Sequence, residues 1–124
     1  MLRDAERQYA LQNVRSGHFL ASRIELAVDS QSRRRGLLGR DNLDHGAGLI
    51  IAPCSAIHTF SMRFAIDVVF VARDGRVLKT YSALGRRRIA FSVGAFAAIE
   101  LPAGAISGTQ AQPGDIVELV SQQT

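Results

Sequence analysis

The sequence predicts a mainly β (β-rich α+β) domain, with a compact barrel-like or sandwich fold of six to seven strands and one or two short helices. Three observations favour this class. Short apolar and β-branched runs recur along the 124 residues. Turn signals such as Asp74-Gly75 and Pro113-Gly114-Asp115 separate these runs. The pattern contains no long alternation of strand and helix, which a parallel sheet would require.

A chain of this length corresponds to one domain. We divide it into an N-terminal arm over residues 1–17 and a single β-rich domain over residues 18–124. The apolar residues of the first twelve positions follow helical spacing only in part. This segment therefore leaves two interpretations open, a frayed helix and an ordered arm.

The first strand and helix of the domain follow one another closely. Alternation of apolar and polar residues predicts a half-buried strand over Arg23–Asp29. Asp29 and the serines after it offer side-chain oxygens to cap a short helix, which would extend to Leu38. A short apolar strand is expected over Ala47–Ala52, because Pro53 ends it.

The middle of the chain predicts two more strands. Ile57–Met62 alternates, so that His58, Phe60 and Met62 share one face. Ile66–Val71 is almost continuously apolar and β-branched, which is typical of a strand covered on both sides.

Asp74-Gly75 is the strongest local signal in the chain. A two-residue Asp-Gly link between strand-like runs favours a type I′ turn. It predicts a hairpin of Ile66–Arg73 with Arg76–Ala83. The resulting register places Phe70 opposite Lys79, Val71 opposite Leu78, and Asp67 opposite Ser82.

The last third of the chain is expected to hold two strands and a helical turn. Gly85–Ser92 is polar and basic and predicts a connection. Ala95–Leu101 is an apolar strand or short helix that Glu100 interrupts. One helical turn is expected within Pro102–Gln112, followed by a strand over Ile116–Val120.

The chain is basic, with a net charge of +4 and a pI of about 10.2. Two arginine clusters, Arg33–Arg35 and Arg86–Arg88, are consistent with binding to nucleic acid or an anionic membrane, or with a solvated surface. Nucleic-acid binders interleave aromatic and basic residues. Aromatic residues make up 6% of the chain and none lies within either cluster. The sequence therefore favours the solvated surface.

Location and redox chemistry are constrained by the same composition. No apolar run reaches the length of about 20 residues that spans a bilayer. Charged residues, including Asp4 and Glu6, interrupt the N-terminus, which is unlike a secretory signal. Cys54 is the only cysteine, so no internal disulfide can form. We therefore expect a cytoplasmic protein.

Several short motifs occur together in a fixed order. They are Arg35-Gly36-Leu37-Leu38-Gly39-Arg40, Gly48-Leu49-Ile50-Ile51, Ile57-His58-Thr59-Phe60-Ser61-Met62, Ile66-Asp67-Val68-Val69-Phe70-Val71, Ile99-Glu100-Leu101-Pro102-Ala103-Gly104 and Gly114-Asp115. In this order they resemble the uncharacterised family called domain of unknown function 192, over about residues 25–120. The resemblance implies a compact, mainly β fold with short helices, and it implies no activity.

Polar side chains within apolar strands mark the candidate site, because a buried polar group is costly unless it has a partner. Asp67, with Arg40 or Arg63 as its partner, is either a ligand-binding carboxylate or an anchor for neighbouring main chain. Glu100 and His58 likewise admit a structural or a functional role. The predicted ligand-binding residues are His58, Thr59, Met62, Asp67, Glu100 and Arg40.

We expect these residues to line a polar cleft of a non-catalytic binding domain, which would take a small polar molecule or an extended peptide. One alternative is a small hydrolase with His58 as base and Asp67 orienting it, or with Cys54 as nucleophile. A second is a nucleic-acid or acidic-surface binder. The paired His or Cys spacing of zinc sites is missing, so we expect neither metal nor cofactor.

Overall fold

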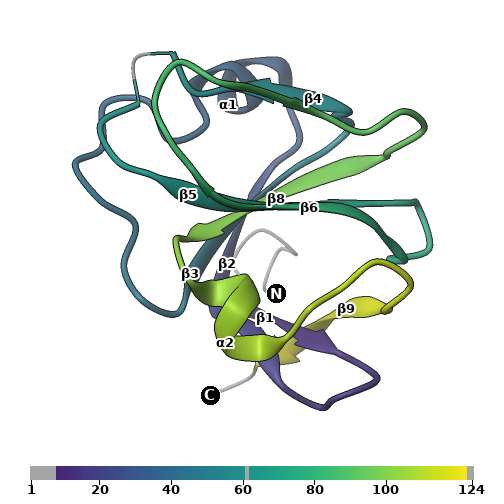
Figure 1. Ribbon diagram of the computed structural model, residues 1–124. Helices are drawn as coiled ribbons and strands as arrows, with labels where there is room; N and C mark the ends of the chain where they lie inside the picture. Colours follow the sequence, from purple (N-terminus) through teal and green to yellow (C-terminus); the bar gives the residue numbers. More distant parts are fainter. Residues whose placement is uncertain (1–7, 61, 123–124) are drawn as a thin grey trace, which may run out of the picture.

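A computed structural model describes residues 8–60 and 62–122 and confirms the mainly β class. Within them the chain forms nine strands and two short helices (Figure 1). Their bounds are β1 Gln8–Asn13, β2 Phe19–Ala27, α1 Ser30–Arg35, β3 Ala47–Ile51, β4 Ala56–His58, β5 Ile66–Val71, β6 Val77–Leu84, β7 Ile89–Phe91, β8 Ala97–Pro102, α2 Ala105–Thr109 and β9 Val117–Gln122.

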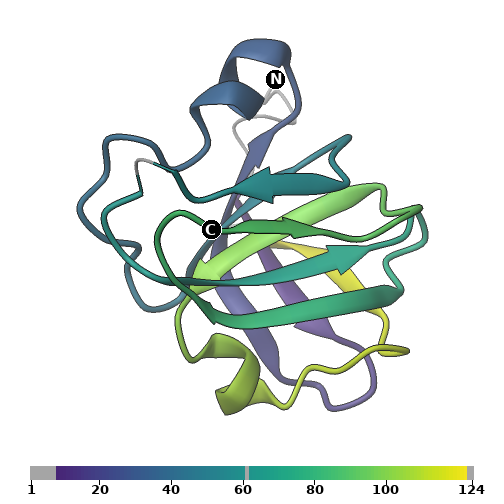
Figure 2. The ribbon, with the colours of Figure 1, turned by 45° about the horizontal axis from the view of Figure 1, so that its top comes forward.

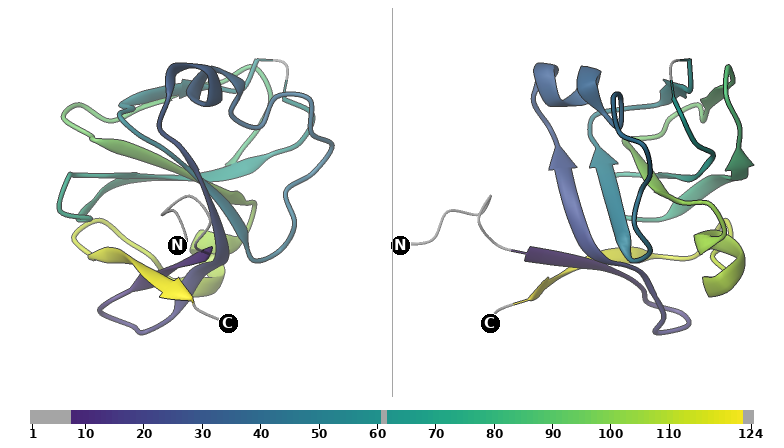
Figure 3. Two further views of the ribbon diagram at one scale, coloured as in Figure 1. Left: turned by 180° about the vertical axis from the view of Figure 1, so that it is seen from behind. Right: turned by 90° about the vertical axis from the view of Figure 1, so that its left-hand side faces the viewer.

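Seven strands form one sheet in the order β6-β5-β8-β3-β2-β1-β9, and β4 pairs with β7 in a second, two-stranded sheet. Every pairing is antiparallel except that of β2 with β3, which run side by side in one direction (Figure 3).

The large sheet curls until the start of edge strand β6 meets the residues that lead into the other edge strand, β9. Val77 donates its main-chain N–H to Asp115 at 2.8 Å, and it accepts from Gly114 at 2.9 Å. Beyond this end the two edges do not pair within the described residues. The sheet is therefore curled without being a closed barrel.

An apolar core covers each face of the large sheet. Helix α2 covers one face, and α1 and the β4–β7 sheet lie on the other (Figure 2). Strand β5 separates the two cores, and all six of its side chains are buried. The residues buried on the α2 side include Leu11, Val69, Val71, Ile99, Leu101, Ile106 and Val117, and those on the α1 side include Leu37, Ile51, Met62, Ile66, Val68, Phe70 and Ala98.

The predicted hairpin of β5 with β6 is present, but its turn differs from the predicted one. Asp74 is absent from the residues with positive φ, whereas Gly75 has φ +90°, so the turn is not type I′. Gly75 N–H donates to Ala72 at 2.9 Å, and Ala72 N–H to Arg76, which makes a three-residue loop. Phe70 lies opposite Lys79 as predicted.

Two pairs of the predicted register are wrong. Asp67 has no register partner on β6, because the register shifts between Ile66 and Val68, so it does not lie opposite Ser82. The other pair differs because of the longer loop. A bulge after Phe70 places Val71 opposite Val77 instead of Leu78. The extra residue of the loop causes this shift, because it moves the start of β6 by one position relative to β5.

Three further differences concern short segments. Residues 1–7 of the predicted arm lie outside the described residues, and Gln8–Asn13 form a strand rather than a helix. Ile89–Phe91 pair with β4, although the sequence indicated only a connection. The strand predicted over Ile57–Met62 ends at His58. Asp29 caps α1 as predicted, and its side chain accepts from Ser32 N–H at 2.7 Å.

Candidate functional site

The two buried carboxyl groups of the predicted site lie on opposite faces of the sheet. In the pairing of β5 with β8, Asp67 lies opposite Leu101 and Val68 lies opposite Glu100. Residues opposite each other share a face, and neighbours along a strand alternate. Asp67 therefore shares the α2 side with Leu101, whereas Glu100 shares the side of α1 and β4 with Val68.

Asp67 is fully buried, and main-chain donors surround its carboxylate. Oδ1 accepts from Ala83 N–H at 2.7 Å, and Oδ2 accepts from Gly104 N–H at 3.1 Å and Ile106 N–H at 2.9 Å. The carboxylate thus holds the end of β6 and the start of α2 against β5. The two arginines expected as its partners bind elsewhere.

Arg40 makes a two-bonded ion pair with Glu25, with both N···O distances at 2.9 Å. Arg63 pairs with Asp41 at 2.6 Å on the surface. Neither arginine reaches Asp67, because the carboxylate lies on the other face of the sheet with main-chain donors around it.

Thr59 is also fully buried and serves the main chain. Its hydroxyl donates to Gly85 C=O at 2.6 Å and accepts from Arg88 N–H at 2.8 Å. Its own N–H donates to Arg88 C=O at 2.8 Å. Thr59 therefore fixes the connection between β6 and β7 next to the end of β4.

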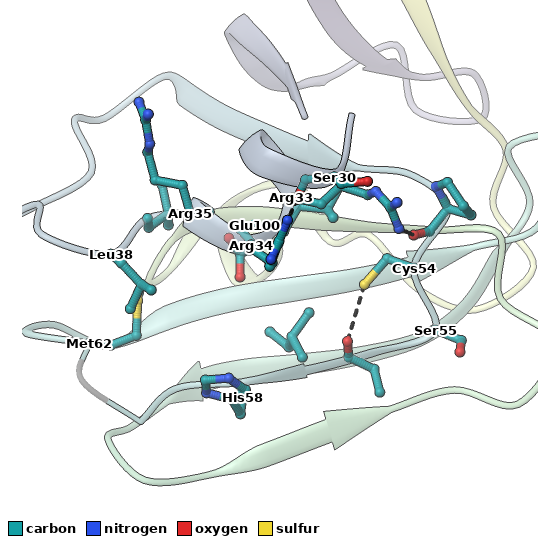
Figure 4. A pocket seen from close by; sticks show the side chains of 16 residues that line it. Ser30, Arg33, Arg34, Arg35, Leu38, Cys54, Ser55, His58, Met62 and Glu100 are labelled. Atoms are coloured by element: carbon teal, nitrogen blue, oxygen red, sulfur yellow. Dashed lines mark hydrogen bonds between the residues drawn. The ribbon is translucent and has the colours of Figure 1, made fainter. Parts of the chain in front are cut away.

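A cavity of about 670 Å³ lies between α1 and β4. Figure 4 shows Arg33 and Glu100 beside the helix, with Cys54 and His58 across the cavity. Met62, which is buried, completes the wall at one end. The structure therefore brings together three of the six predicted residues, His58, Met62 and Glu100, and leaves the other three outside.

Glu100 is the electrostatic centre of this cavity. Its side chain is 5% exposed, and burial raises its pKa to about 7, although the positive charge of Arg40 acts in the opposite direction. Glu100 Oε1 and Arg33 Nε are buried without a hydrogen-bond partner among the described residues. A Cβ added to Gly36 would lie 3.9 Å from Oε1, so the end of α1 packs close to the carboxyl.

The surroundings of Cys54 argue against a reactive thiol, and those of His58 place its ring at the surface. The Cys54 thiol lies 3.2 Å from Ala56 C=O and donates to it. Burial and the charge of Glu100 raise the pKa of this thiol, which disfavours the reactive thiolate. His58 is exposed, and its ring stacks on Phe60 with 5.3 Å between the centroids.

Sequence reasoning missed the contribution of α1 to the site. Arg33 was interpreted as part of a solvated cluster, but its Nε is buried against the cavity. The signal that could have located it is the N-cap at Asp29. A helix that starts there repeats every 3.6 residues, so only some of the three arginines can point to solvent.

The fold and this cavity define a mainly β domain in which the buried carboxyl group of Glu100 lines a cavity of about 670 Å³. The sequence profile of domain of unknown function 192, described as "Uncharacterized ACR", matches residues 11–119. The chain therefore belongs to this family, as its motifs indicated. No curated protein matches the chain.

Two solved structures share the fold. One, from Sinorhizobium meliloti 1021, is described as a "putative transcription regulator"; it has a TM-score of 0.78 and 24% identity over 96% of this chain and 97% of that chain. The other, from Novosphingobium aromaticivorans DSM 12444, is described as a protein of unknown function; it has a TM-score of 0.77 and 23% identity over 95% of this chain and 91% of that chain. At this identity the likeness shows the fold alone.

Two further features of the described residues concern membranes and metal ions. Both helices are too short to cross a bilayer. No three His, Cys, Asp or Glu side chains gather closely enough within residues 8–60 and 62–122 to hold a metal ion.

Proposed function

We propose that the domain is a non-catalytic binding module whose ligand occupies the cavity between α1 and β4. The observation that carries this proposal is the unpartnered Oε1 of Glu100. Buried polar groups are almost always hydrogen-bonded, because an unsatisfied one costs about 1–3 kcal/mol. A ligand that donates a hydrogen bond to Glu100 would remove that cost.

The cavity suits a small polar molecule or one end of an extended peptide that carries an amine or amide. Leu37, Ile51 and Met62 supply apolar contact, while Glu100 supplies one strong acceptor. Most ligand sites combine an apolar lining with a few convergent polar groups in this way.

The outer edge of β4 adds support for a peptide. Ser55 C=O and Thr59 N–H bond to the β7 side, at 3.0 Å and 2.8 Å. Alternation along an antiparallel strand turns the main-chain groups of Ala56 and His58 away from β7, and both residues line the cavity. Ala56 C=O already accepts from the Cys54 thiol, so an extended chain would pair with this edge through the main-chain groups of His58.

Catalysis by the predicted dyad finds no support in the geometry. His58 lies in the β4–β7 sheet, whereas the Asp67 carboxylate lies beyond the large sheet and accepts from three main-chain groups. A base and its orienting carboxylate need hydrogen-bond contact. The cytoplasmic location stays a prediction.

The test is titration with methylamine, acetamide and trialanine, followed by NMR of the Met62 methyl group and the Ala56 amide. We expect at least one probe to shift these signals. The charge-assisted hydrogen bond should make Glu100→Gln bind that probe about tenfold more weakly. Glu118→Gln is the matched control, because Glu118 is an exposed residue of β9. Absence of shifts with every probe, or equal affinity of both variants, would refute the proposal.

A further inference from the structure

The two-stranded sheet of β4 and β7 presents an exposed face rich in rings. His58 lies opposite Ile89, and Ala56 lies opposite Phe91, so these side chains share one side of the ladder. Phe60 joins them by stacking on His58. Phe60 is 45% exposed, Ile89 64% and Phe91 52%. We call His58, Phe60, Ile89 and Phe91 the β4–β7 face.

Lys79 and a basic connection border this face, and the chain segments that form it contain no acidic residue. Lys79 Nζ lies 4.6 Å from the Phe91 ring centroid. Arg86, Arg87 and Arg88 fill the connection that leads into β7, and Thr59 holds that connection beside β4. Neither Cys54–Ile66 nor Val77–Ile99 contains Asp or Glu. Among the described residues, none forms an ion pair with Lys79 or these arginines.

The kinds of residue on the β4–β7 face indicate the chemistry of the partner that would bind there. Exposed rings offer stacking to a planar group, and unpaired cations offer binding to an anion. A second copy of this chain would bring the same cations face to face, which disfavours self-association. Each nucleotide of a single-stranded nucleic acid carries a base that can stack on a ring and a phosphate that can bind a cation. Single-stranded nucleic acid therefore matches both the rings and the cations of this surface.

We propose that the β4–β7 face binds single-stranded nucleic acid without sequence preference. Bases stack on Phe60, His58 and Phe91, and phosphates lie against Lys79 and the Arg86–Arg88 connection. The sequence disfavoured this function because neither arginine cluster contains an aromatic residue. The fold supplies the aromatics from β4 and β7 instead. This function goes beyond ligand binding at Glu100, although His58 borders both the cavity and the β4–β7 face.

Fluorescence anisotropy of a labelled oligouridylate of about twelve nucleotides tests the proposal. Three phosphate contacts on a single strand predict that raising salt from about 50 to about 200 mM weakens binding about 20-fold. No binding at the lower salt would overturn the proposal. So would binding to phosphatidylserine vesicles without any to the oligonucleotide.

Matched variants separate stacking from charge alone. Loss of one base stack should make Phe60→Ala or Phe91→Ala bind at least about fivefold more weakly. The control is Phe19→Ala on β2, where the ring is 47% exposed. Circular dichroism checks that each variant is folded. If both ring variants bind as tightly as F19A, the stacking proposal is wrong.

The arginines are tested with equal charge removal at two places. Arg87→Gln combined with Arg88→Gln should weaken binding about tenfold and flatten the salt dependence. Arg23 and Arg76 are exposed and lie away from the β4–β7 face. The double variant Arg23→Gln with Arg76→Gln should therefore change the affinity by less than about twofold. Equal losses for both pairs would mean that net charge, and not this face, attracts the oligonucleotide.

Discussion

Asp67 and Glu100 lie on neighbouring strands, one residue out of register, and their carboxyl groups point to opposite sides of the sheet. This single difference gives them opposite surroundings. Asp67 accepts from three main-chain N–H groups, while Glu100 Oε1 accepts from none among the described residues. The first carboxyl holds neighbouring main chain in place, and the second is the acceptor on which our proposed binding function rests.

The role of Asp67 is tested by Asp67→Asn. The amide keeps one acceptor, but its NH₂ group faces a main-chain donor, so at least one buried N–H loses its partner. We expect the free energy of unfolding to fall by about 3 kcal/mol, measured by urea denaturation. Asp41→Asn, whose side chain is 84% exposed, is the control and should change it by less than about 0.5 kcal/mol. Equal midpoints would show that Asp67 does not anchor the main chain.

The raised pKa of Glu100 gives stability a dependence on pH. The folded protein keeps this proton up to about pH 7, whereas the unfolded chain releases it near pH 4.5. The contribution to stability is full below the lower value and is lost as the pH rises to the higher one.

Glu100→Gln cannot titrate, so it isolates this effect. Going from about pH 4.5 to about pH 8, we expect the variant to gain stability relative to the native protein by on the order of 3 kcal/mol. Urea unfolding at the two pH values measures the difference. A difference that does not change with pH would contradict a buried, titrating carboxyl.

Asp115 should show the opposite dependence. Hydrogen bonds from Arg15, at 2.6 Å from Nε, and from Asn13, at 2.8 Å, lower the pKa of Asp115 to about 2. This group therefore stabilises the fold above about pH 4, and the contribution is lost as the pH falls to about 2. We expect Asp115→Asn to unfold more readily than the native protein at pH 7, by about 1–3 kcal/mol. The difference in stability between the native protein and the variant should narrow as the pH falls, which thermal melts at several pH values can measure. A difference that stays constant with pH would show that Asp115 does not have a lowered pKa.

Gly75 should tolerate no side chain. Its φ is +90°, and a Cβ would fall on the Val117 carbonyl oxygen of the neighbouring strand. We expect Gly75→Ala to cost about 3 kcal/mol, because both backbone strain and a steric clash oppose it. Gly94, with φ +82° and no atom within 4 Å of an added Cβ, is the matched control. Gly94→Ala should cost about 1 kcal/mol in the same denaturation experiment, and equal costs would exclude the clash.

Local patterns were sufficient for the elements whose partners are close in sequence. An almost continuous run of apolar and β-branched residues marked Ile66–Val71, and the structure has a strand with those bounds. The Asp-Gly signal marked the hairpin. Strand β1 was missed because its short sequence, half of it polar, becomes a strand only through pairing with β2 and β9. Strand β7 was missed because its three residues need β4 beside them.

The site was predicted in part for a related reason. In a strand covered on both sides, apolar residues occur at every position, so the pattern does not show which face a polar residue takes. Asp67 and Glu100 therefore seemed equivalent. Only the register of β5 with β8, together with the helix over each face, separates them.

The antiparallel pairing of β1 with β9 joins residues more than a hundred positions apart, such as Leu11 with Leu119. Leu11 and Val117 belong to the same α2-side core, so during synthesis their contact can form only after Val117 has left the ribosome. Contacts of such long sequence separation slow folding. The nascent chain therefore keeps an unpaired strand edge open to chaperones or to other chains until its last strand emerges.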